Sequence, residues 1–489
     1  MILLMLLVAV PARAQAPPRP TARLSGRALA QRDSLPPLAD TLRLYGADLA
    51  VRTPLSTFAA PPGALPLSLD DAIRLALERN PDRRASLLEA ERAANDATRG
   101  NAGFLPTLDA GAGLSGSQSY GIGGRTGGSA TAPRTSRARG ATSLSTDLTV
   151  GYTVFDGNRR TATLARLRAD ARRFAFSADA DAEALVRDVA AAYLDVLRQT
   201  ALEGAQAEQV TLSEDRLRVQ SAQTRIGTAA DIDAALALAD LNADRAGLLR
   251  QRLALQAARI ELGALLALED PDAVAATDTL GEGIAPAPFA VDTSGARNRD
   301  VLALRAAEAA AREAIREARA DYAPTLRVQA GPGLTFQNPS FYRPVTPTLT
   351  PNIAYGFTAV LPILDGGQRD RRLANARLRA DQAALDTDAA RLRLRADVAR
   401  LAATDEGFRQ LAALETQNVA IARANARVAL AQLELGFITS LDLRQVQLAL
   451  LDAESRRIDA RYQALLAATD LRLRAGDLLP EDAAIAPGE

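Results

Sequence analysis

The stretch of sequence that decides the fold covers residues 158–225 and reads NRRTATLARLRADARRFAFSADADAEALVRDVAAAYLDVLRQTALEGAQAEQVTLSEDRLRVQSAQTR. It contains no proline and a single glycine, Gly204, so little in it would interrupt a helix. At about 1.5 Å per residue such a helix is roughly 100 Å long, which is more than a globular domain can enclose. The sequence therefore predicts an elongated molecule built on helices that lie side by side.

A second copy of this pattern follows later in the chain. Residues 156–233 align without gaps on residues 365–442, and residues 80–106 align without gaps on residues 298–324. The two halves differ in length between these blocks, where a loop can absorb the difference. The chain is therefore predicted to contain two internal structural repeats.

Each repeat is predicted to hold a helix, a strand hairpin, a long helix and a second helix, in that order. The first repeat is expected at residues 67–268, with its hairpin at 105–155, its long helix at 158–225 and its second helix at 229–267. The second repeat is expected at residues 295–476, after a linker at 269–294, with the corresponding elements at 325–363, 367–434 and 439–475. The two shorter helices of a repeat together match the long one in length, so we expect them to lie end to end beside it.

Apolar residues recur every seven positions along the second long helix, which is typical of coiled-coil packing. One series is Leu394, Leu401 and Phe408, and another is Leu414, Ile421, Val428 and Leu435. Because the two series differ by one residue, we expect the packing register to slip between Phe408 and Leu414.

The hairpins carry a strict alternation of side-chain types. Between residues 143 and 155 the even positions are mostly apolar, as in Leu144, Leu148 and Val150, whereas the odd positions are small or polar. Residues 325–336 and 352–363 alternate in the same way. One apolar and one polar face suits a tilted strand that crosses a bilayer, and it suits a half-buried strand of a soluble sandwich equally well.

The two ends of the chain lie outside the repeats. Residues 1–14 read as a signal peptide, because an apolar run ends in the small-x-small pattern Ala12-Arg13-Ala14. Residues 15–66 are rich in proline and are expected to form an extended arm, and residues 477–489 form a C-terminal tail. No later stretch is apolar for the 18 or so residues that a membrane-spanning helix requires, so insertion into a membrane would take a closed β-barrel.

The composition argues against an enzyme. The chain has 58 basic and 58 acidic residues, which leaves no electrostatic footprint for nucleic acid. It has no cysteine and no histidine, which excludes thiolate chemistry, a lipid anchor on cysteine, the usual zinc sites and Ser-His-Asp triads. Every basic residue is arginine, which excludes a lysine-dependent phosphate loop or Schiff base. We expect no catalytic residue, cofactor or resident metal.

Two kinds of junction stand out in both repeats. Asp156-Gly157 and Asp365-Gly366 lie where a strand becomes a helix, and there the aspartate can cap the helix while the glycine allows the bend. Gly227 and Gly436 lie in the helix–helix turns, where glycine supplies the left-handed conformation that ends a helix. Each turn is followed by a carboxylate, Asp233 or Asp442, for which helix capping is the structural interpretation.

The order of these motifs resembles the TolC-like outer-membrane efflux family over residues 66–476. The resemblance rests on Leu67-Ser-Leu-Asp-Asp-Ala-Ile-Arg-Leu-Ala-Leu-Glu-Arg-Asn80-Pro81, Phe104-Leu-Pro-Thr-Leu108, Val154-Phe-Asp-Gly157, Pro362-Ile-Leu-Asp-Gly366-Gly367 and Leu435-Gly-Phe-Ile-Thr-Ser-Leu-Asp442. It implies an α+β membrane protein: a homotrimeric, twelve-stranded transmembrane β-barrel with four strands per chain, continuous with a long α-helical barrel in the periplasm. It also implies an outer-membrane exit duct for efflux or type I secretion, with outer-membrane lipid around it. Its expected partners are a periplasmic adaptor and, through the adaptor, an inner-membrane RND or ABC pump.

The resemblance also implies that the duct is gated at its periplasmic tip, by Asp233, Leu433, Ile438 and Asp442. Three copies of Asp442 around the symmetry axis would form an acidic ring that favours cations. In the family, polar links between the tip turns hold the gate shut, whereas Leu433 and Ile438 are apolar here, so we expect a more apolar closure. The remaining turn residues are candidate contacts for the adaptor: Arg225, Gly227, Thr228, Gly436, Phe437, Thr439 and Ser440.

The main alternative is a secreted, trimeric coiled-coil stalk or adhesin without transport activity. Such a protein would share the heptad pattern and the export signal, but it would neither enter a bilayer nor conduct ions.

Overall fold

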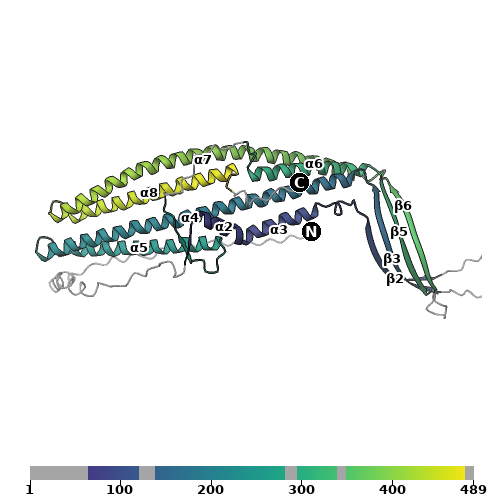
Figure 1. Ribbon diagram of the computed structural model, residues 1–489, viewed down its shortest axis with the longest axis horizontal. Helices are drawn as coiled ribbons and strands as arrows, with labels where there is room; N and C mark the ends of the chain where they lie inside the picture. The colour runs from purple at the N-terminus through teal and green to yellow at the C-terminus, as the bar shows by residue number, and fades with distance from the viewer. Residues whose placement is uncertain (1–63, 121–137, 281–293, 339–347, 479–489) are drawn as a thin grey trace, which may run out of the picture.

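The computed structural model describes residues 64–120, 138–280, 294–338 and 348–478 of the chain. Its helices run side by side along one long axis, and a four-stranded sheet projects from one end of them (Figure 1). The fold is α+β. The expected signal peptide, almost all of the proline-rich arm and nearly the whole C-terminal tail lie outside the described residues.

The elements follow the repeat. The first half contains β1 (Leu65–Leu67), α2 (Leu69–Arg79), α3 (Pro81–Asp96), β2 (Thr107–Tyr120), β3 (Ala138–Phe155), α4 (Arg159–Arg225) and α5 (Asp231–Leu265). The second half contains β4 (Val274–Ala276), α6 (Arg299–Arg319), the short 3-10 helix η2 (Ala320–Tyr322), β5 (Thr325–Asn338), β6 (Thr348–Val360), α7 (Gln368–Glu434) and α8 (Ser440–Ala475).

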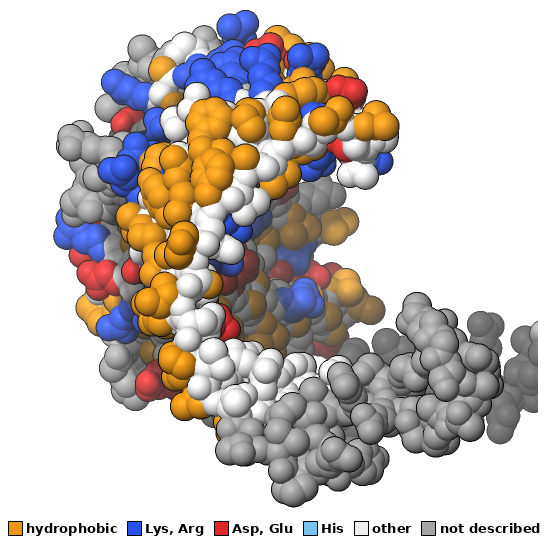
Figure 2. All heavy atoms as spheres, turned by 90° about the vertical axis from the view of Figure 1, so that its right-hand side faces the viewer, with side chains coloured by type: hydrophobic (Ala, Val, Ile, Leu, Met, Phe, Trp, Pro, Cys, Tyr) orange, Lys and Arg blue, Asp and Glu red, His pale blue; other side chains and the backbone are white. Residues whose placement is uncertain are grey.

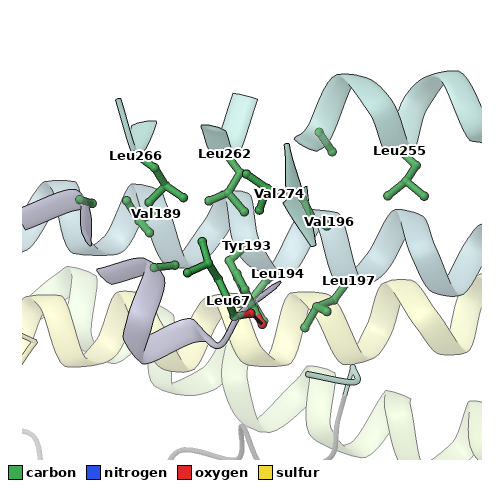
Figure 3. Close-up of a cluster of buried hydrophobic side chains, with 13 residues drawn as sticks. Leu67, Val189, Tyr193, Leu194, Val196, Leu197, Leu255, Leu262, Leu266 and Val274 are labelled. Carbon is green, nitrogen blue, oxygen red and sulfur yellow. Dashed lines mark hydrogen bonds between the residues drawn. The ribbon is translucent and has the colours of Figure 1, made fainter. Parts of the chain in front are cut away.

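Two short strands lie where the sequence suggested irregular chain. β1 comes from the end of the proline-rich arm and β4 from the linker, and they pair in parallel with Leu65 opposite Val274. Their contact closes the largest buried cluster, in which Leu67 and Val274 meet α4 and α5 around Tyr193 (Figure 3). The Tyr193 hydroxyl lies 3.0 Å from the Leu67 carbonyl oxygen and 2.8 Å from an Asp278 carboxylate oxygen. The arm and the linker are therefore tied to the middle of the molecule at this point.

One predicted boundary was wrong. The expected hairpin end at residue 363 is too late, because β6 ends at Val360, and Pro362 has no backbone N–H to extend a ladder. The helix that begins at Pro81 ends at Asp96 and gives way to turns, in which Gly103 adopts a positive φ of 81°.

Shorter helices flank both long helices. α4 packs against α3 and α5 on one side and against α6 and α8 on the other, and α6 and α8 also pack against α7. Figure 1 shows α3 and α5, and likewise α6 and α8, one after the other along the long axis. This is the end-to-end arrangement that the helix lengths predicted. It leaves α7 at one edge of the helical layer and α3 with α5 at the other.

The predicted slip of register in α7 is absent. From Ala380 onward its buried residues keep a single heptad register: Ala380, Thr387, Leu394, Val398, Leu401, Glu415, Val419, Ala426, Ala429 and Leu433. The series from Leu414 to Leu435 is a separate stripe, which is exposed in this chain. The sequence suggested a slip because small and polar residues occupy part of the buried seam, while large aliphatic residues occupy the exposed one.

The sheet has the order β2-β3-β5-β6, and all its pairs are antiparallel. Its register places the apolar positions of neighbouring strands opposite one another, as in Leu108 with Val150 and Leu144 with Phe336. One face of the sheet is therefore apolar across all four strands, and it appears as an arc of hydrophobic side chains in Figure 2. Within the described residues β2 and β6 each pair on one side only, so the sheet has two open edges.

An acidic group is buried without full compensation in the middle of α4. Glu183 and Asp179 are almost completely buried, and the Arg299 guanidinium lies 3.9 Å from each carboxylate. Burial raises the pKa of Glu183 to about 8, and the charge of Arg299 offsets this only in part. Folded protein therefore keeps Glu183 protonated at neutral pH, whereas the unfolded chain releases this proton near its ordinary pKa of 4.5.

This difference predicts a pH-dependent stability. Between pH 4.5 and about 8 the unfolded state loses the proton that the folded state keeps, so this group lowers stability as the pH rises. Replacing Glu183 by Gln should raise stability at pH 8 by roughly 2–4 kcal/mol and leave it nearly unchanged at pH 4. Thermal unfolding midpoints at both pH values test this, with E91Q as an exposed control. Equal gains at both pH values would contradict the explanation.

Candidate gate at the helical tip

The two helix–helix turns lie side by side at the end of the molecule opposite the sheet (Figure 1). A cleft of about 540 Å³ separates them. Seven of the residues expected at the gate or the tip line it: Thr228, Asp233, Leu433, Gly436, Ile438, Thr439 and Ser440. Arg225, Gly227, Phe437 and Asp442 belong to the same turns but do not line the cleft. The structure therefore brings most of the predicted residues to one place.

Both turns end their first helix in the same way. Gly227 and Gly436 have φ values of 79° and 76°, and each N–H bonds to the carbonyl three residues earlier. The next residue of each turn, Thr228 or Phe437, donates its backbone N–H to the carbonyl five residues earlier at 2.9 Å. This pair of hydrogen bonds requires a residue in the left-handed conformation, which is why both turns use glycine.

The two carboxylates after the turns cap their helices unequally. Asp442 accepts the backbone N–H of Thr439 at 2.9 Å and its hydroxyl at 2.6 Å, while the Thr439 hydroxyl accepts the Asp442 N–H. These bonds from Thr439 lower the pKa of Asp442, so its exposed carboxylate stays ionised at neutral pH. In the first turn the cap residue is Ala230, which has no side-chain acceptor, so only its N–H bonds to Asp233, at 3.3 Å.

The apolar gate positions lie in a small core of the tip. Leu433 is 2% exposed and clusters with Ala429 and Leu443, and Ile438 packs on this group together with Val219 of α4. The cluster therefore joins three helices just behind the second turn. Leu433 and Ile438 hold the second hairpin together and hold it against α4.

Polar links between the two hairpins lie beside this core, and they were not found from the sequence. The Gln223 side-chain amide at the end of α4 donates to the Leu433 carbonyl at 3.0 Å. Deeper in, Arg444 of α8 donates two bonds to the Asp244 carboxylate of α5, at 2.6 and 2.9 Å. Gln447 of α8 donates to the Leu212 carbonyl of α4 at 3.0 Å. We call these three contacts the hairpin latch.

Asp244 is the centre of the hairpin latch. It is 7% exposed and also accepts the hydroxyl of Ser213, so a single carboxylate joins α4, α5 and α8. Its hydrogen bonds raise the pKa of Arg444, so the guanidinium stays charged at all accessible pH values. A sequence signal was present: Asp244 interrupts a buried seam of leucines at heptad spacing, Leu241, Leu248, Leu255 and Leu262.

The strand-to-helix junctions are repeated in detail. The Asp156 carboxylate accepts the Arg160 N–H at 3.1 Å, and Asp365 does the same for Arg369. The two arginines reach back to strand carbonyls, Arg160 to Thr153 and Val154, and Arg369 to Pro362 and Ile363. Gly157 and Gly366 turn the chain with φ values of 67° and 63°. Aspartate, glycine and arginine together form a clamp that fixes the strand to the helix.

Two features are absent from the described part of the chain: a metal-binding cluster and a membrane-spanning helix. No three His, Cys, Asp or Glu side chains lie close enough together there to hold a metal ion. No helix in the described ranges is long and apolar enough to cross a membrane.

Residues 72–268 and 290–477 match the family model described as outer membrane efflux protein, and the chain belongs to this family. A comparison with curated protein sequences gave no match.

Solved structures support the fold. A membrane protein from Pseudomonas aeruginosa is 22% identical, with a TM-score of 0.70 over 83% of this chain and 92% of that one. The outer membrane channel CmeC from Campylobacter jejuni is 17% identical, with a TM-score of 0.68 over 84% and 85%. The open state of the MtrE outer membrane channel from Neisseria gonorrhoeae is 21% identical, with a TM-score of 0.63 over 83% and 88%. The family is one of outer membrane efflux proteins, and two of these neighbours are described as outer membrane channels.

The hairpin latch should control the local opening of α8. Replacing Arg444 by Gln leaves the buried Asp244 carboxylate without its cation, which typically costs about 3–5 kcal/mol. Amides of residues 440–450 should therefore exchange with deuterium at least tenfold faster in R444Q. The double variant D244N/R444Q should recover part of this protection, because no unpaired charge remains.

The matched control is R427Q, which removes an exposed arginine of α7 that has no ion pair among the described residues. Equal exchange in R444Q and R427Q would show that the latch contributes nothing to the stability of the tip.

Proposed function

We propose that this chain is one subunit of a homotrimeric exit duct in the outer membrane. Three four-stranded sheets form a twelve-stranded barrel in the membrane, and the helices form a tunnel that reaches into the periplasm. The duct is passive, and it works with a periplasmic adaptor and, through the adaptor, an inner-membrane RND or ABC pump. Family membership supports the outer-membrane efflux role, and the unsatisfied edges of the single chain support the assembly.

The open edges of the sheet carry the proposal. β2 and β6 run in opposite directions, since β2, β3, β5 and β6 alternate, so β6 of one copy can pair antiparallel with β2 of the next. Continued around a ring, this pairing removes both edges and satisfies the backbone groups that a bilayer leaves without water. The apolar face then lies toward lipid and the polar face lines the pore.

Both edges of the helical layer expose apolar side chains, so one edge can pack against the other. α7 exposes six large aliphatic residues in two series at heptad spacing: Leu378, Leu385, Leu392, Leu414, Ile421 and Val428. Leu435, directly after the helix, continues the second series. The opposite edge exposes Leu87 and Leu88 of α3 and Ile232, Leu236, Leu253 and Ile260 of α5. A head-to-tail contact of α7 with the α3 and α5 edge of the next copy buries both sets, and such contacts close into rings.

The gate of the proposed duct is the tip. Asp442 is ionised and exposed, and three copies around the axis would form an acidic ring there. The hairpin latch would hold the α7–α8 hairpin against the α4–α5 hairpin in the closed state. The apolar residues at the turns are exposed and offer contacts to the adaptor, namely Ile226, Leu435, Phe437 and Leu441.

Assembly is tested at the exposed stripe. Replacing Ile421 by Asp places a carboxylate in the proposed contact between subunits, which should leave detergent-purified protein monomeric by light scattering, whereas the natural sequence gives a trimer. The control T416D alters an exposed residue on a different face of α7. A wild-type protein that stays monomeric and does not conduct would exclude the duct.

Gating is tested at the hairpin latch. In planar bilayers, R444Q and D244N should raise the mean single-channel conductance several-fold, because each removes one partner of the pair that holds the hairpins together. R427Q should conduct as the wild type does. A conductance unchanged in both latch variants would place the closure elsewhere.

A further inference from the structure

Four segments meet where the sheet joins the helices: residues 97–106, 155–160, 318–325 and 361–372. Ion pairs and ring contacts join them, as in the pair of Arg159 with Asp321 and the stacking of Arg369 on Tyr322 at 5.2 Å. We call this region the junction collar. If the sheet lies in the membrane, the collar lies at the level of the lipid headgroups on the periplasmic side.

The junction collar is basic in a chain that is neutral overall. It contains seven arginines and four aspartates: Arg99, Arg159, Arg160, Arg319, Arg369, Arg371 and Arg372 against Asp156, Asp321, Asp365 and Asp370. Figure 2 shows basic side chains gathered directly beside the apolar arc of the sheet. This concentration of positive charge therefore borders the face that is proposed to contact lipid.

The aspartates of the junction collar are already occupied. Asp156 and Asp365 pair with arginines of their own clamps, and Asp321 pairs with Arg159 and Arg372. Asp370 accepts the Tyr322 hydroxyl. Arg319 and Arg371 are exposed and form no ion pair among the described residues. In the single chain these two guanidinium groups are therefore open to an external anion. Arg371 lies one heptad before Leu378, so it borders the proposed contact between subunits.

Apolar side chains stand out from the same region. Leu364 and Ile363 are 91% and 87% exposed, the highest values for large apolar residues in the described part of the chain. Membrane interfaces usually carry tryptophan and tyrosine, and this chain has no tryptophan. Arginine with adjacent aliphatic residues can also anchor a protein at the membrane interface, because the guanidinium group binds phosphate while the aliphatic groups enter the acyl region.

We propose that the junction collar binds anionic phospholipids of the periplasmic leaflet. Arg319 and Arg371 bind the lipid phosphate groups, and Ile363 and Leu364 insert between the acyl chains. Guanidinium groups suit this role because they stay charged and present several donors to phosphate oxygens. This inference rests on the proposed function, since it requires the sheet to lie in the outer membrane.

The test compares lipid binding by full-length protein purified in detergent. Native mass spectrometry counts the bound phosphatidylglycerol and phosphatidylcholine after equal additions. The natural sequence should retain the anionic lipid preferentially, and R319Q/R371Q should lose about tenfold in apparent affinity for it. The control R393Q/R395Q removes two exposed arginines from the same helix as Arg371, which have no ion pair among the described residues. It should bind lipid as the wild type does.

The other outcomes are equally decisive. Equal loss in both double variants, no preference for phosphatidylglycerol, or displacement of the lipid by millimolar inorganic phosphate would overturn the inference. Each of these leaves the duct intact if the protein still fractionates with the outer membrane and conducts ions. A wild-type chain that does neither overturns the proposed function, and this inference with it.

Discussion

The architecture depends on a sheet whose two edges and one apolar face are incomplete in a single chain. Along β2 and β6 the outward backbone groups have no partner among the described strands. In water such edges invite association, and in lipid each unsatisfied group costs several kcal/mol. A ring of copies solves both problems at once. The exposed stripe on α7 is the helical counterpart, because in the proposed ring a neighbour would cover it too.

The joint between sheet and helix carries this constraint into the rest of the molecule. The strands must be held at a fixed angle to helices of 67 residues, because a small error at the joint becomes a large displacement at the tip. The clamp fixes this angle with short-range hydrogen bonds. An aspartate accepts a backbone N–H at the start of the helix, and an arginine donates to the strand carbonyls. A charged pair in one turn of chain fixes the direction of an element about 100 Å long.

The sequence was informative wherever one period or one local rule governs the structure. The alternation of apolar and polar residues predicted the apolar face of the sheet, and the long stretch without proline predicted α4. Both predictions succeeded because neither depends on residues far away in the sequence. The seam of α7 was misread because burial there is decided by packing against α8, which places Glu415 inside and Leu414 outside. The hairpin latch was not predicted, because Arg444 and Asp244 are 200 positions apart and meet only after three helices have packed. β1 and β4 were also missed, because each is a three-residue strand with no periodicity of its own.

The two repeats also differ where the proposed gate lies. The clamp of Asp156 and Arg160 recurs as Asp365 and Arg369, which is expected of a joint that both halves require. The ion pair of the latch does not recur: the positions equivalent to Arg444 and Asp244 are Ala235 and Ala453. The cap also differs, because Thr439 bonds to Asp442 whereas its counterpart Ala230 has no side-chain acceptor. A feature present in both halves belongs to the shared architecture, whereas one present in a single half distinguishes the hairpins. The α7–α8 hairpin is therefore held by its own set of bonds, so it can be released without loosening the joint that both repeats share.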